Sequence, residues 1–66
     1  MIKSVYKWQD GMVMVFDKKG EQIPEYQGQY ENVKESILKD APPDTVFSHG
    51  FWDEAELLKV VPREEW

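Results

Sequence analysis

The first third of the chain holds two β-rich runs on either side of a tight turn. Residues 2–9 and 12–17 are dominated by the β-branched, aromatic and methionine side chains that suit a pleated, half-buried surface. Asp10-Gly11 separates them. Asp-Gly between two such runs predicts a hairpin with a two-residue loop, because both central residues of a type I′ turn need a positive φ.

The length of that loop decides which side chains share a face, because cross-strand partners point to the same side of a sheet. A two-residue loop places Trp8 opposite Val13. One face of the predicted hairpin then carries Tyr6, Trp8, Val13 and Val15, and the other carries Val5, Met12, Met14 and Phe16 together with Lys3 and Lys7. Strand 12–17 is apolar on both faces, so it is either covered on both sides or exposes an apolar surface.

The pattern after the hairpin predicts a return strand over residues 21–26. The turn before it ends at Gly20, which suits the left-handed geometry that such a position requires. Pro24 cannot donate a ladder hydrogen bond, so this strand is expected at an edge of the sheet. The three strands together form an antiparallel meander with residues 12–17 in the middle.

A helix is predicted over about 29–41. Tyr30, Val33, Ile37 and Ala41 recur at helical spacing and place an apolar stripe on one side. Pro42-Pro43 ends the helix, because the residue before a proline avoids the α region.

The last third predicts one or two further strands. Residues 45–48 suit a strand. Residues 57–61 end in β-branched side chains before Pro62, which favours a strand, whereas a short helix starting at a capping box of Asp53 and Glu56 is the alternative. The expected fold is a single two-layer α+β domain over 1–66: a β-meander, one amphipathic helix packed on it, and the C-terminal strands.

Composition limits how such a domain can be stabilised. A chain of 66 residues buries only about 60% of its unfolded surface. It has no cysteine and one histidine, so disulfides and the commonest zinc sites are excluded, and close packing or self-association must compensate. No apolar leader or membrane-length segment is present, and we expect a cytoplasmic protein.

The net charge of −5 is concentrated in the last third. Residues 44–66 carry two basic side chains against six acidic ones, a net of −4. Because phosphate backbones are bound mainly through Lys and Arg, this surface argues against a nucleic-acid partner and suits a basic one.

No motif in the chain indicates catalysis. His49 is the only side chain with an unperturbed pKa near neutrality, but neither Asp44 nor Asp53 has a spacing that requires it to orient the ring. Asp53, Glu54 and Glu56 lack the spacing of a calcium loop. We therefore expect no enzyme activity, no cofactor and no metal site.

Two functional hypotheses follow. The first is a non-enzymatic interaction module that binds a protein, or a second copy of itself, through an apolar sheet face. Its candidate residues are Met12, Met14, Phe16 and Trp66, with Trp66 either on that face or exposed for contact. The second is an acidic inhibitor or decoy that engages a basic surface. Its candidate residues are Asp53, Glu54, Glu56, Glu64 and Glu65.

Overall fold

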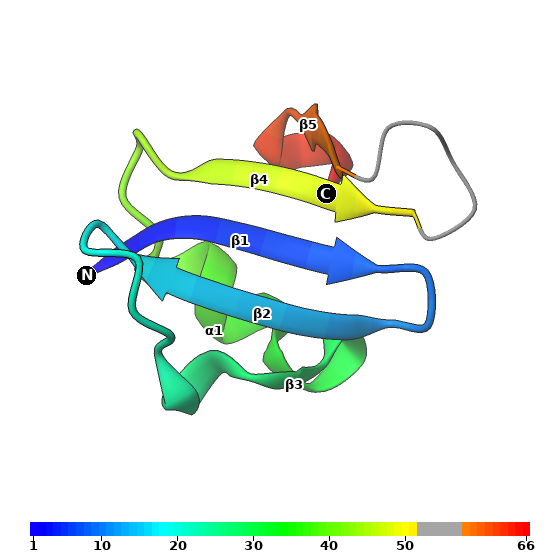
Figure 1. Ribbon diagram of the computed structural model, residues 1–66, viewed down its shortest axis with the longest axis horizontal. Helices are drawn as coiled ribbons and strands as arrows, with labels where there is room; N and C mark the ends of the chain where they lie inside the picture. The colour runs from blue at the N-terminus through cyan, green and yellow to red at the C-terminus, as the bar shows by residue number, and fades with distance from the viewer. Residues whose placement is uncertain (52–57) are drawn as a thin grey trace.

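The computed structural model describes residues 1–51 and 58–66, which form a mixed sheet with one helix packed on it (Figure 1). The order of the strands in the sheet is β3-β2-β1-β4-β5. The elements are β1 (Ile2–Trp8), β2 (Met12–Asp17), the 3-10 turn η1 (Pro24–Tyr26), β3 (Gly28–Gln29), α1 (Tyr30–Asp40), β4 (Val46–Gly50), β5 (Leu58–Val61) and the 3-10 turn η2 (Arg63–Glu65). The expected α+β architecture is confirmed.

The register of the β1–β2 hairpin differs by one residue from the predicted one. Val5 lies opposite Val15, whereas the Asp-Gly turn predicted Phe16 there. The loop has three residues and ends at Gly11, whose φ of +88° lies in the left-handed region typical of such loops. Its N–H donates to the Trp8 carbonyl at 2.9 Å and closes the turn.

This one-residue slip moves half of the hairpin's side chains to the opposite face, because side chains alternate along a strand. Tyr6 and Trp8 join Met14 on one face, and Val5 joins Val13 and Val15 on the other. The prediction that Tyr6 and Trp8 share a face with Val13 and Val15 was therefore wrong.

The predicted third strand over residues 21–26 is also wrong in its extent. Gln22 makes a single bridge to Phe16, and the chain then enters η1 at Pro24. The side-chain amide of Gln27 donates to the Val15 carbonyl at 3.0 Å, in place of further strand pairing. The edge strand β3 is only two residues long, so this edge offers little to a pairing partner.

Helix α1 lies within one residue of its predicted bounds and covers one face of the sheet, behind β1 and β2 in Figure 1. Ile37 is fully buried, and Tyr30 and Val33 pack beside it against the core. The helix ends where Pro42-Pro43 predicted, with the Ala41 N–H donating to the Ile37 carbonyl at 2.8 Å.

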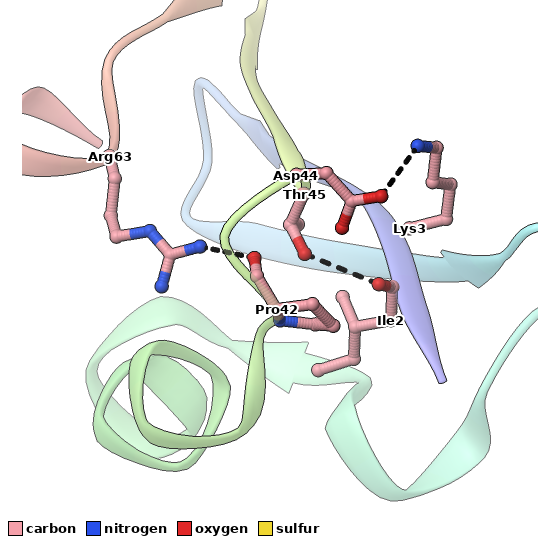
Figure 2. Close-up of polar contacts among 6 residues, drawn as sticks. All are labelled: Ile2, Lys3, Pro42, Asp44, Thr45 and Arg63. Atoms are coloured by element: carbon pink, nitrogen blue, oxygen red, sulfur yellow. Dashed lines mark hydrogen bonds and ion pairs between the residues drawn. The ribbon is translucent and has the colours of Figure 1, made fainter.

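Three contacts fix the connection from α1 to β4 (Figure 2). The Arg63 guanidinium donates to the Pro42 carbonyl at 2.5 Å. The Thr45 hydroxyl donates to the Ile2 carbonyl at 3.2 Å, and Lys3 pairs with Asp44 at 3.3 Å. These contacts place β4 beside β1, to which it runs parallel, an arrangement that local sequence patterns did not predict.

The C-terminal segment decides between the strand and the helix that the sequence allowed, and it places Trp66 elsewhere than expected. Residues 58–61 form strand β5, antiparallel to β4, in place of a helix. The predicted capping box at Asp53 and Glu56 lies outside the described residues. Trp66 is neither exposed nor beside Met14. It is 4% exposed and packs on the helix side of the sheet, because Pro62 and η2 turn the chain toward α1.

Trp66 fills the part of the core that α1 does not reach. Its ring lies 5.1 Å from that of Phe47 and 5.0 Å from that of Tyr30. The indole N–H donates to the Ser48 carbonyl at 3.3 Å, and the Tyr30 hydroxyl donates to the Trp66 carbonyl at 2.9 Å. The buried core, all of it in one cluster, is Ile2, Val5, Val13, Val15, Ile37, Ala41, Phe47 and Trp66.

We expect Trp66→Ala to lower the free energy of unfolding by about 3–5 kcal/mol, the usual cost of truncating a buried tryptophan. A domain of this length has a total stability of about 3–10 kcal/mol, so much of the variant would be unfolded. Urea unfolding followed by circular dichroism measures the change. Val60→Ala, at a residue that is 70% exposed, is the control. A Trp66→Ala protein as stable as this control would contradict the placement of Trp66 in the core.

The turn after β2 predicts a pH dependence of stability. The Asp17 carboxylate accepts hydrogen bonds from the backbone N–H groups of Glu21 at 3.0 Å and Lys19 at 2.9 Å, which hold the pKa of Asp17 below its ordinary value of 3.8. A depressed carboxyl pKa stabilises the fold above that value, and this stabilisation is lost as the pH falls through the folded-state pKa. We expect stability to fall less steeply in Asp17→Asn than in the wild type between about pH 5 and pH 2. Urea unfolding at a series of pH values measures this. The prediction is refuted if the unfolding free energies of the two proteins fall with pH in parallel.

A candidate interaction surface on the open sheet face

The face of the sheet turned away from α1 is made of side chains that the strand pairing brings together. Residues paired across neighbouring strands share a face, so each set of pairs forms a row across the sheet. The rows on this face are Phe16–Ser4–Val46, Met14–Tyr6–Ser48–Val60 and Trp8–Gly50–Leu58, and Met12 lies two residues from Met14 on the same side. We call these residues the open face.

Several side chains of the open face are exposed to solvent, whereas the core side chains on the helix side are buried. Val60 is 70% exposed, Leu58 46%, and Met12 and Val46 40% each. On the helix side, Val5 and Val15 are 0% exposed. In Figure 1, α1 and η2 lie on the far side of the strands, and no described element covers the near side. The described part of the C-terminal segment therefore does not cover this face.

Side chains of the open face are held in place by contacts with one another. The Tyr6 and Phe16 rings pack edge to face with their centroids 5.6 Å apart. The Trp8 indole N–H donates to the Met14 sulfur at 3.3 Å. These contacts restrain the large side chains, which lowers the entropy that a partner would have to remove on binding.

A glycine in β4 leaves room for a large side chain at the centre of the open face. The Trp8 ring lies directly over Gly50, where a Cβ atom would overlap three carbons of the indole. Ser48, the next residue of β4 on this face, is only 3% exposed. A larger side chain at position 50 would displace the Trp8 ring.

Charge separates the two faces. No residue in the rows of the open face is charged. On the helix side, one row instead places Lys7, His49 and Lys59 next to one another. The Lys7 ammonium lies 4.0 Å from the centroid of the Tyr30 ring, a cation–π geometry. The expectation that Lys7 interrupts the face of Met14 was wrong, because the register differs.

His49 lies in strand β4, on the helix side of the sheet. Its Nε2 lies 3.5 Å from the Trp66 carbonyl oxygen, and its row neighbours are the two lysines. Asp44 is paired with Lys3 at the far end of β4. Within residues 1–51 and 58–66, no group of three or more histidine and acidic side chains is arranged to hold a metal ion.

The sequence identified part of the open face. It placed Met12, Met14 and Phe16 together, and the structure brings them onto one face. It missed Tyr6 and Trp8 through the register. It also missed Val46, Leu58 and Val60, because only the pairing of β4 with β1 and of β5 with β4 brings them there.

The predicted acidic surface is described only in part. Glu64 and Glu65 are exposed on η2, on the helix side of the sheet. Asp53, Glu54 and Glu56 lie outside the described residues. The predicted acidic surface is therefore described only at Glu64 and Glu65.

Comparisons with protein families, with curated proteins and with solved structures give no match for this chain. The helix found in the described residues is too short and too polar to cross a membrane.

Gly50→Ala tests the packing of the open face. We expect the added methyl to displace the Trp8 indole and to cost about 1–3 kcal/mol of stability, as is usual for overpacking. The indole N–H resonance of Trp8 should shift in a two-dimensional NMR spectrum. Ser4→Ala, on the same face but away from the indole, should leave that resonance in place. An unmoved Trp8 resonance in Gly50→Ala would show that the ring does not lie over Gly50.

Proposed function

We propose that this protein is a non-enzymatic interaction module and that the open face is its binding surface. One observation carries the proposal: a contiguous apolar face, without a charged side chain in its rows, lies on the side of the sheet opposite the core. Val60, Leu58 and Met12 are among its exposed members. Contiguous apolar patches of a few hundred Å² on a small domain commonly mark sites of interaction with other proteins.

The kinds of residue on the open face support binding to a protein. Tyrosine and tryptophan are enriched at binding hot spots, and methionine adapts its shape to a partner. Tyr6, Trp8, Met12 and Met14 supply all three types within two neighbouring strands. A surface of this composition that extends over four strands fits another protein better than a small molecule, which needs a concave site.

The acidic inhibitor remains a prediction from charge alone. Its binding to a basic partner would weaken as salt is added, because ions screen opposite charges. Binding through the uncharged open face would not weaken in this way, so the salt dependence separates the two.

Photo-crosslinking through methionine tests the proposal. Two of the three methionines, Met12 and Met14, lie on the open face, so replacing methionine by photo-methionine places two reactive groups there. We expect crosslinked adducts in a lysate of the source cells that mass spectrometry maps to these two positions.

Matched variants show whether the adducts depend on the open face. Val60→Lys places a charge on this face, at a site exposed enough to keep the fold, and we expect it to reduce the adducts at least about fivefold. Ser36→Lys adds the same charge on an exposed position of α1 and should not reduce them. Adducts that survive Val60→Lys, or their absence from the wild type, would refute the proposal.

A further inference from the structure

We propose that the partner of the open face is a second copy of this chain, packed sheet against sheet around a two-fold axis. This inference rests on the proposed function, since it assigns the occupant of that same surface. It would give the sheet a second covering layer, with α1 and Trp66 on one side and the other copy on the other.

Shape favours a second sheet as the occupant. Stacked sheets pack about 10 Å apart with their strands roughly aligned, and each presents a broad, flat array of side chains. The open face presents such an array, because its rows cross β2, β1, β4 and β5 and the Trp8 ring lies over Gly50. A two-fold axis brings the same patch of both copies together, so the apolar side chains of one open face contact those of the other.

Charge does not oppose contact between two copies through this face. Each chain carries a net charge of −5, so an approach through charged surfaces brings like charges together. The rows of the open face bring none into contact. The remaining repulsion acts over a distance and is screened by salt, whose Debye length is about 10 Å at 0.1 M. Self-association through this face should therefore strengthen as salt is added.

The edge of the sheet is a less suitable place for a second copy. Strand β5 is an edge strand in the described sheet, but Lys59 lies in its middle and Pro62 follows it. Lysine and proline on an edge strand disfavour its pairing with a strand of another molecule. Face-to-face packing is therefore favoured over a sheet that continues from one copy to the next.

Area sets the strength of this dimer. Strands spaced about 4.8 Å apart with a rise of about 3.3 Å per residue give the open face on the order of 400 Å² on each copy. A standard-size interface takes about 800 Å² from each partner, and smaller ones belong to weak, reversible complexes. We therefore expect a dissociation constant in the micromolar to millimolar range.

The test is sedimentation equilibrium from about 10 µM to about 1 mM protein, a range that brackets a weak interface. We expect the mass to rise from monomer to dimer, and added sodium chloride to move the midpoint to lower concentration. Val60→Lys and Leu58→Lys should each raise the dissociation constant at least about tenfold, whereas Ser36→Lys should leave it within about twofold. Thermal unfolding of each variant confirms that it is folded.

Methionine methyl NMR locates the interface in the same samples. The Met12 and Met14 methyl signals should shift between dilute and concentrated protein. Met1, which is 91% exposed and precedes β1, is an internal control that should not shift.

The outcomes separate this inference from the proposed function. A monomer at every concentration, combined with crosslinks to another protein that Val60→Lys removes, would overturn the second copy and keep the interaction module. A monomer without crosslinks would overturn both. A dimer that Val60→Lys does not weaken would place self-association elsewhere and overturn the inference.

Discussion

The hydrogen bond from the Gly11 N–H to the Trp8 carbonyl closes a three-residue loop, and the character of both sheet faces depends on that loop. It sets Val5 opposite Val15, and so gives one face its small aliphatic core. With a loop one residue shorter, Tyr6 and Trp8 would lie beneath α1 and Lys7 would lie beside Met14. The separation of charge from apolar surface follows from this register, because a one-residue slip exchanges the faces of a whole strand.

Two different segments cover the helix side of the sheet. Helix α1 covers β1 and β2, and Trp66 covers β4 by packing on Phe47 while its indole N–H donates to Ser48. Arg63, in the turn before Trp66, donates to the carbonyls of Ala41 and Pro42. The same short segment thus closes the core and anchors the end of the helix. A chain with so little surface to bury depends on such doubly used residues.

Local patterns predicted what local forces determine. The helix over 29–41 was correct to within one residue at each end, because an apolar stripe and Pro42-Pro43 specify it without reference to the rest of the chain. The hairpin was located but not its register, since Asp10-Gly11 is compatible with loops of two and of three residues. The parallel pairing of β4 with β1 and the burial of Trp66 depend on contacts between distant residues. Val46, Leu58 and Val60 therefore escaped prediction as members of the candidate surface, because they belong to it only through the pairing of β4 with β1 and of β5 with β4.

An exposed apolar surface is unfavourable in water unless something covers it. The residues of the open face differ from those expected on a sheet face that only contacts water. A sheet that needed only to be soluble would alternate apolar and polar positions, as antiparallel sheets with one face in water do. Here β2 keeps Met12, Met14 and Phe16 on the side away from the core, while Lys7 of β1 and Lys59 of β5 lie in one row with His49 on the helix side. Gly50 then lets the Trp8 ring lie over β4. Charge is absent from the rows of this exposed apolar face, and this composition supports the proposal that the face binds a partner.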